Sequence, residues 1–228
     1  MEEEVVLGQE KKEKVKKKRR WYNIVSAVFA FILLAFVMAY AIFCFIFPST
    51  KVVGVSMKPT LNSYTELLEG QPDEYYETSV YQDKIYVNRF DKGGLDDVVV
   101  VKKEDKNVVK RIIATPGQTL KLVKESDGFY YYYRDGVKLE ETYIKSRVEM
   151  NYAYYGKFKA TYGTDEITIQ EGCLFVLGDN RGYSYDCAGY HYSQIKTSNV
   201  VGKVCIQLEY NENIFGYFWH GFWGLFGI

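Results

Sequence analysis

The feature that most constrains this chain is a long uncharged stretch close to its N-terminus. Residues 24–47 contain no charged side chain, and Ser26 and Tyr40 are the polar members. As a helix, this stretch would be about 36 Å long, which exceeds the hydrocarbon core of a bilayer, about 30 Å thick. A cleavable secretory signal has a shorter apolar region of about 7–15 residues, followed by a small-residue cleavage site that this chain does not show. We therefore expect an uncleaved transmembrane anchor over residues 21–47, ended by Pro48.

The charges on either side of the anchor predict its orientation. Residues 1–20 carry eight Lys or Arg against five Glu, whereas Lys51 is the one basic residue that closely follows the anchor. Because basic residues are retained on the cytoplasmic side, residues 1–20 should form a cytoplasmic tail. Everything from Ser49 onward should lie outside the cytoplasm, in a single-pass protein of the cell membrane with the lipid bilayer as a partner. The formal net charge of the chain is zero, which gives no support for a nucleic-acid partner.

The rest of the chain has the pattern of a mainly β protein. Aromatic residues make up 17% of the sequence, and 22 of them are tyrosines, which favours strands over a helical bundle. Short apolar or alternating runs are bounded by Gly, Pro and Asp turns, as in Pro116-Gly117 and Asp135-Gly136. Strands are predicted at residues 84–88, 98–101, 108–114, 120–122, 129–133, 167–169, 174–177 and 200–208.

These strands predict an antiparallel β-sheet domain that is interrupted by an insertion. Its first part covers residues 48–117, an inserted β region covers 118–173, and its second part covers 174–210. Residues 62–82 have little apolar periodicity and are expected to form a long loop. Residues 211–228 form an aromatic tail that either lies at the membrane interface or packs on the β domain.

The cysteines and histidines give no sign of a metal site. There is neither a CxxC pair nor a Cys/His cluster, so a structural zinc site is not supported. Three cysteines outside the anchor could form one disulfide and leave one thiol, or all three could be small buried residues; the second alternative is preferred. The residues concerned are Cys44 in the anchor, Cys173, Cys187 and Cys205 beyond it, and His191 and His220.

A serine shortly after the anchor is a candidate nucleophile. Ser56 lies in the octapeptide GVSMKPTL, which by itself could be a strand that ends in a tight bend. It follows Phe47 by nine residues, which span at most about 30 Å, so it should lie near the outer membrane surface. A serine hydroxyl needs a base at neutral pH, and a chain with two histidines offers poor support for a Ser-His-Asp triad.

A neutral lysine could be that base. Strand alternation places Val108, Lys110 and Ile112 on one face, and apolar neighbours of this kind favour desolvation, which lowers a lysine pKa. The alternative is that Lys110 points to solvent and Arg111 points inward. Periodicity does not decide between the two, because both faces of the strand are apolar.

Three motifs, in this order and after a membrane anchor, resemble the conserved boxes of type I signal peptidases, the membrane-bound Ser/Lys proteases that remove signal peptides. They are Gly54–Leu61, Lys110-Arg111 with Pro116-Gly117, and Gly178–Arg181 with Ser184 and Asp186. The match covers most of residues 20–208, and the form GVSMKPTL with a single anchor resembles the Gram-positive kind.

The resemblance implies a role for each matching residue. Ser56 would be the nucleophile, Lys110 the general base, and Ser184 the serine that hydrogen-bonds and orients this lysine. The oxyanion hole would use the backbone N–H of Ser56. Some relatives add a serine hydroxyl two residues earlier; because Gly54 stands there, a second donor would have to be backbone or water. The polar residues that brace the site would be Asp179, Arg181 and Asp186.

One departure from the family pattern concerns the end of the third box. The family usually continues with Ser-Arg, whereas this chain has Cys187-Ala188. An arginine that would pair with Asp186 is therefore missing, and Arg181 or Lys196 could replace it.

The resemblance implies a serine endopeptidase that cleaves exported preproteins on the outer face of the cytoplasmic membrane through an acyl-enzyme, without metal or organic cofactor. Its partners would be secreted preproteins with signal peptides and the export machinery. One alternative is a Ser/Lys peptidase with a narrow client, such as a pilin or conjugation protein; another is a catalytically silent anchored binding module. The SxxK sequence at Ser193–Lys196 also fits penicillin-binding enzymes, but their SDN and KTG motifs are absent.

Overall fold

The structure is a computed structural model that describes residues 2–62, 82–144, 152–189, 193–209, 212–214 and 216–217. The loop predicted at residues 62–82 lies, apart from its ends, outside the described residues. The same holds for most of the aromatic tail at residues 211–228. The predictions made for these two segments therefore stay predictions.

The N-terminal helix α1 runs from Glu2 to Ile46 and includes the predicted anchor. It is longer than expected, because most of the basic segment before residue 21 is helical as well. Within it, Lys14–Ile46 is long and apolar enough to cross a membrane, and large apolar side chains such as Phe31 and Phe36 are more than two-thirds exposed. The helix ends two residues before Pro48, as expected from the restriction that proline places on the residue before it.

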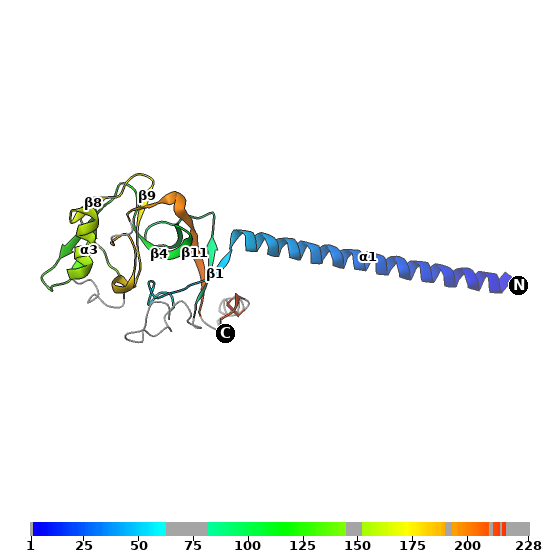
Figure 1. Cartoon of the computed structure of the whole chain (residues 1–228). Coiled ribbons are helices and arrows are strands. Elements are labelled where there is room, and N and C mark those ends of the chain that lie inside the picture. Colours follow the sequence, from blue (N-terminus) through cyan, green and yellow to red (C-terminus); the bar gives the residue numbers. More distant parts are fainter. Residues whose placement is uncertain are drawn as a thin grey trace. The chain divides into compact units, whose positions relative to one another are not determined.

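A seven-stranded antiparallel sheet forms the main part of the β domain (Figure 1). In spatial order its strands are β1 (Ser49–Lys51), β2 (Lys84–Asn88), β11 (Val200–Leu208), β3 (Val98–Lys103), β4 (Lys106–Ala114), β9 (Cys173–Leu177) and β10 (Ile195–Lys196). The register places Lys110 of β4 opposite Val99 of β3, and Arg111 opposite Leu177 of β9. Arg111, in the middle of β4, is therefore flanked by strands on both sides.

The valine run of β3 is buried on both faces of this sheet. Val99 and Val101 contribute to one apolar cluster, whereas Val98 and Val100 contribute to the other. A strand buried on both faces reads as a continuous apolar run instead of an alternating one. The neighbouring strand β4 is held in the middle of the sheet, which places Lys110 away from solvent.

A second antiparallel sheet is formed by the chain between β4 and β9. Its strands, in spatial order, are β7 (Val137–Lys138), β6 (Tyr130–Arg134), β5 (Thr119–Lys124) and β8 (Glu166–Thr168). The hairpin turn predicted at Asp135-Gly136 is present, with φ of 51° and 80°, as a type I′ turn requires. The predicted mainly β, antiparallel fold with an inserted β region is confirmed.

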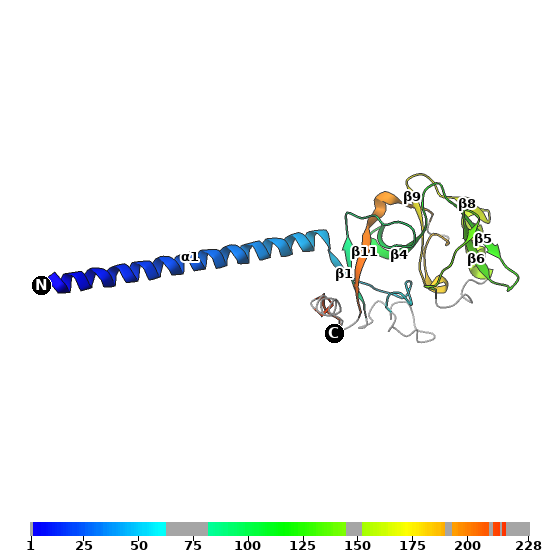
Figure 2. The same cartoon turned by 180° about the vertical axis from the view of Figure 1, so that it is seen from behind.

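The inserted region also contains a helix that the sequence did not predict, α3 (Tyr152–Tyr162). It lies beside the four-stranded sheet in both views (Figures 1 and 2). Phe158 of α3 is fully buried, and its ring centroid lies 6.0 Å from that of Tyr132 in β6 and 6.2 Å from that of Phe175 in β9. This aromatic contact joins the helix to both sheets.

All four cysteines lie in the described part of the chain and all are free thiols. The expectation that the three outer cysteines are buried is correct for Cys187 and wrong for Cys205, which is exposed; Cys173 is half-buried. Cys205 is exposed because the register of β11 against β2 shifts between Val204 and Ile206, which places it at a bulge.

Candidate active site

Lys110 is buried and contacts the hydroxyl of Ser56. Its side chain is 3% exposed, and its Nζ donates a hydrogen bond of 2.8 Å to Ser56 Oγ. Burial lowers the pKa of Lys110, and the carboxylates of Asp186 and Asp179 offset only part of this effect. Lys110 forms no ion pair with any residue that the structure describes. A lysine with a lowered pKa next to a serine hydroxyl is the arrangement that a Ser/Lys peptidase requires.

The octapeptide that contains Ser56 forms turns and is not a strand. Gly54 has φ of +87°, a left-handed conformation that glycine adopts without steric cost. The N–H of Lys58 then donates to the carbonyl of Val55. These turns bring Ser56 to the end of β1 and within reach of β4.

Gly178 lets the loop after β9 approach Ser56 closely. A Cβ atom on Gly178 would lie 2.3 Å from Ser184 Oγ and 2.4 Å from the carbonyl oxygen of Ser56, so no larger residue fits there. Asn180, two residues after Gly178, makes two hydrogen bonds to the turn that contains Ser56. Its backbone N–H donates to the carbonyl of Ser56 at 3.0 Å, and its Nδ2 donates to the carbonyl of Val55 at 3.1 Å. Asn180 thus fixes this turn, a role that we did not predict.

Ser184 is placed next to the other predicted site residues, but its expected hydrogen bond to Lys110 is not formed. Its Oγ is buried and has no hydrogen-bond partner among the described residues. The hydroxyl packs toward Gly178 and the backbone of Ser56 instead. A buried hydroxyl without a partner costs free energy, and such groups concentrate at functional sites.

Asp179 is braced by Arg111, the residue after Lys110. Arg111 donates in a bidentate manner to Asp179, with Nε–Oδ1 at 2.9 Å and Nη2–Oδ2 at 2.6 Å, and Thr60 Oγ1 donates to the same carboxylate. The guanidinium also stacks on Tyr143, 4.0 Å from its ring centroid. Of the two alternatives for this strand, the structure has Lys110 buried and Arg111 on the opposite face, tied to the loop after β9.

Arg181 forms a buried ion pair with Glu141, which comes from the inserted region after β7. Arg181 is 1% exposed and Glu141 is 7% exposed, and they are joined by two hydrogen bonds, of which Nη1–Oε2 measures 3.1 Å. Tyr143 donates to the same carboxylate at 3.0 Å, and Arg181 Nε donates to the carbonyl of Gly178 at 3.1 Å. The inserted region therefore supports the loop that packs on Ser56.

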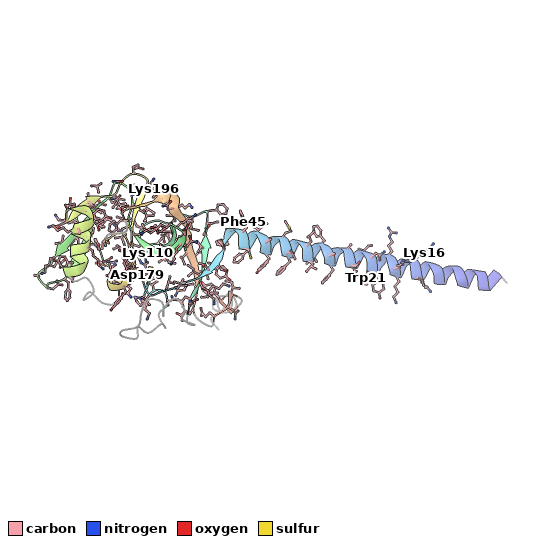
Figure 3. All side chains as sticks on the ribbon, viewed as in Figure 1. Lys16, Trp21, Phe45, Lys110, Asp179 and Lys196 are labelled. Carbon is pink, nitrogen blue, oxygen red and sulfur yellow. The ribbon has the colours of Figure 1, made fainter. Side chains whose placement is uncertain are left out.

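The expectation that Arg181 or Lys196 replaces the missing arginine beside Asp186 is wrong. Arg181 forms its ion pair with Glu141, and Lys196 is exposed, at the edge of the β domain and away from Lys110 and Asp179 (Figure 3). The carboxylate of Asp186 instead accepts hydrogen bonds from the backbone N–H groups of Gly178 at 2.9 Å and Ala188 at 3.1 Å.

Cys187, at the position where the family usually has serine, behaves as a buried neutral group. Its thiol accepts a hydrogen bond from the N–H of Val176 and donates one to the carbonyl of Ser193. Burial raises the pKa of Cys187 to about 12, so it stays protonated at neutral pH. The change from serine therefore adds no charge beside Lys110.

A cavity of about 150 Å³ opens beside Ser56 and Lys110. One wall is the backbone segment from Thr50 to Val53 and the other is the segment from Asn107 to Val109, with Met57 and Val100 completing the lining. Two extended segments on either side suit a third extended chain, and the small volume suits small apolar side chains. In the described part of the chain, no cluster of three His, Cys, Asp or Glu side chains could hold a metal ion.

Comparison with known proteins finds similarity to one family of peptidases. The family model described as "Signal peptidase, peptidase S26" matches residues 25–208. The chain is 31% identical over 193 residues to signal peptidase I V of Bacillus subtilis, which covers 82% of this chain and 97% of that protein. It is 31% identical over 199 residues to signal peptidase I of Bacillus caldolyticus, covering 85% and 91%. A crystal structure of a signal peptidase I from Enterococcus faecalis is 26% identical, covers 50% of this chain and 97% of that chain, and gives a TM-score of 0.39.

Proposed function

Because this chain belongs to the signal peptidase family, peptidase S26, and is thus a serine peptidase, we propose that it removes signal peptides from exported preproteins with Ser56 as nucleophile and Lys110 as general base. The observation that carries this proposal is the 2.8 Å hydrogen bond between Lys110 Nζ and Ser56 Oγ at a lysine that is 3% exposed. The lowered pKa of Lys110 increases the fraction that is neutral and able to accept a proton.

In the first half of the reaction, neutral Lys110 accepts the hydroxyl proton of Ser56 as Oγ attacks the scissile carbonyl. The N–H of Ser56 donates no hydrogen bond to any described residue, so it is available to the developing oxyanion. The carbonyls of Val55 and Ser56 are held by Asn180, which fixes the direction of this N–H. Lys110 then gives the proton to the leaving amine, and an acyl-enzyme remains.

In the second half, Lys110 accepts a proton from a water molecule that attacks the acyl carbon. Lys110 then gives this proton to Ser56 Oγ as the acyl–Oγ bond breaks, which restores the free hydroxyl and the neutral amine. Arg111, Asp179, Arg181 and Asp186 do not contact the reacting atoms in this scheme; they hold the loop that packs against Ser56. Ser184 belongs to the same loop, and its hydroxyl lies beside Gly178.

We propose that the preprotein binds as an extended segment between residues 50–53 and 107–109. The cavity of about 150 Å³ beside Ser56 would then hold the side chains that precede the cleaved bond. The resemblance to type I signal peptidases implies small side chains at positions −1 and −3, and the small volume and valine lining of the cavity suit such side chains. Preproteins with Leu or Phe at these positions should be cleaved poorly.

The helix Lys14–Ile46 would anchor the enzyme as a single-pass protein with its basic N-terminus in the cytoplasm and the β domain outside. Ser56 would then act close to the outer membrane surface, where the export machinery delivers its substrates. An external protease added to spheroplasts should degrade the β domain. Protection of this domain would reverse the orientation.

The proposal is tested by cleavage of a purified preprotein in detergent or liposomes. Wild type should release the signal peptide, whereas Ser56→Ala and Lys110→Met should not. Lys121→Met, at an exposed position in the second sheet, is the matched control and should cleave as wild type does. Undiminished cleavage by Ser56→Ala or Lys110→Met would exclude the proposed dyad, and a wild type inactive on a panel of preproteins would favour a narrow client or a binding role.

A further inference from the structure

Three polar residues from separate parts of the chain form a cluster beside residues 52–54; Asn62 and Asp83 are buried, and Gln207 is half-buried. Asn62 and Asp83 are 3% and 1% exposed and exchange two hydrogen bonds of 2.8 Å: the N–H of Asn62 donates to Asp83 Oδ2, and the N–H of Asp83 donates to Asn62 Oδ1. Gln207 of β11 donates from Nε2 to Asp83 Oδ2 at 3.0 Å and to the carbonyl of Thr60 at 2.9 Å. We call Asn62, Asp83 and Gln207 the polar clasp.

The polar clasp holds the backbone of residues 52–54. Asn62 Nδ2 donates to the carbonyls of Val52 at 3.0 Å and of Gly54 at 2.8 Å. The N–H of Val52 donates to the carbonyl of Asp83 at 2.8 Å. The segment is therefore fixed at three points, and the carboxamide of Asn62 supplies two of them.

Asparagine suits this position for two reasons. Its φ is +56°, and asparagine tolerates this left-handed conformation better than most other residues. Its side chain offers two donors and one acceptor, and each of them is used here. No other residue type combines these properties at this length.

We propose that Asn62, acting within the polar clasp, is a positioning residue that sets one wall of the substrate cavity. The wall concerned is Val52 and Val53, which line the cavity beside Ser56. This inference rests on the proposed function, because it assigns the clasp to the binding of the preprotein segment before the cleaved bond.

The clasp and the dyad are held by different contacts. Lys110 is fixed by β4, and the carbonyls of Val55 and Ser56 are fixed by Asn180. Loss of the Asn62 carboxamide should therefore displace the wall more than the reacting atoms. The consequence is a rise in KM with a much smaller change in kcat, the pattern of lost substrate binding that is equal in ground state and transition state.

The experiment measures kcat and KM for cleavage of a preprotein by the full-length enzyme in detergent. Asn62→Asp keeps the shape and the tolerance for positive φ but replaces the two donors with an oxygen. We expect KM to rise about tenfold and kcat to fall less than about threefold, as the loss of two hydrogen bonds implies. Asn62→Gly, which keeps the backbone conformation and removes the carboxamide, should act in the same direction. The control Asn199→Asp, an exposed position in the short helix η3 (Thr197–Asn199), should leave both constants unchanged.

Two further variants extend the test. One distinguishes the loss of hydrogen-bond donors from repulsion between carboxylates, and the other tests the polar clasp without changing Asn62. Asn62→Asp combined with Asp83→Asn relieves repulsion between two carboxylates but restores no donor to the carbonyls of Val52 and Gly54, so KM should stay raised. Gln207→Leu leaves the contacts of Asn62 in place and should raise KM less than Asn62→Asp does.

The outcomes distinguish this inference from the proposed function. If the wild-type enzyme cleaves no preprotein, the proposed function itself is wrong. If wild type cleaves and the folded Asn62→Asp and Asn62→Gly variants keep the wild-type KM, the positioning role is overturned. It is equally overturned if kcat falls while KM is constant, or if adding Asp83→Asn restores KM. Should neither Asn62 variant fold, an unchanged KM in Gln207→Leu decides against the inference and a raised KM supports it.

Discussion

Lys110 in the seven-stranded sheet and Lys138 in the four-stranded sheet have pKa values that are displaced in opposite directions. Burial lowers the pKa of Lys110, which donates to a serine hydroxyl and forms no ion pair in the described chain. A hydrogen bond from Lys138 to Glu125, with Nζ–Oε1 at 2.6 Å, raises the pKa of Lys138 at a half-buried site on the inserted sheet. A position on a strand does not by itself lower the pKa of a lysine. Burial without a directly bonded carboxylate lowers it, and the neutral amine can then act as a base.

The ion pairs of the two regions differ in their exposure to solvent. Arg181 and Glu141, below the loop that packs on Ser56, are almost completely excluded from water. Lys121 and Glu166 of the four-stranded sheet are joined at 3.2 Å, with each side chain 52% exposed. Charge around the candidate site is thus part of the core, whereas charge on the inserted sheet is solvated.

The first prediction tests whether Lys110 must lose its proton, by a substitution that keeps the positive charge but cannot be deprotonated. Lys110→Arg retains a cation that stays protonated at any accessible pH, so it cannot accept the proton of Ser56. We expect kcat/KM to fall about 10³-fold or more, within the range lost when a general base is removed. Lys138→Arg should leave kcat/KM unchanged. Retained cleavage in Lys110→Arg would mean that another group accepts the proton.

Much of the fold follows from local sequence patterns, and the candidate nucleophile and base follow from such patterns together with the three family motifs. Strands built from Val, Ile and Tyr and bounded by Gly or Pro turns were predicted within a few residues. Alternation left open whether Lys110 or Arg111 is buried, because both faces of that strand are apolar. These signals are short-range, because alternation and turn chemistry depend on neighbours in the chain.

The supports of the site could not be predicted in the same way. Glu141 meets Arg181 across 40 positions in the sequence, and Asn62 meets Asp83 across 21, so no local pattern marks either pair. The helix α3 was missed because its sequence is rich in tyrosine and its apolar face is small. Its packing is carried by Phe158 against two sheets, a tertiary contact that overrides weak helix propensity.

The second prediction concerns the ion pairs. Glu141→Gln removes the carboxylate from the buried Arg181–Glu141 ion pair and should lower the free energy of unfolding by about 3–5 kcal/mol. Glu166→Gln makes the same chemical change in the exposed Lys121–Glu166 pair. It should lower the free energy of unfolding by less than about 1 kcal/mol. Urea unfolding of the two variants in the same detergent gives the comparison. Equal losses would mean that the Arg181 site admits water and is not distinct from the surface pair.

The third prediction is the pH dependence that follows from the lowered pKa of Lys110. Cleavage requires the neutral amine, so kcat/KM should rise up to about tenfold per pH unit below the folded-state pKa and then level off. Between this pKa and the ordinary value of 10.5, the unfolded chain binds the proton that the folded chain lacks. The contribution of this site to stability therefore rises with pH through this window and is lost as pH falls. Lys110→Met should be more stable than wild type at the acidic end, and the difference should shrink toward pH 10.5. A flat rate profile would contradict a lysine base.

The smallest effect is expected at Lys138, where the sign of the linkage is reversed. Its raised pKa contributes stability below the ordinary value of 10.5, which is lost as pH rises through the folded-state pKa. The lowered pKa of its partner Glu125 contributes stability above about pH 4.5, which is lost as pH falls through the folded-state pKa of that carboxyl. Lys138→Met should therefore be slightly less stable than wild type near neutral pH, and the two should converge at both extremes. Its pH–rate profile should match that of wild type; a displaced profile would show that the inserted sheet influences the protonation of Lys110 and that the two regions are electrostatically coupled.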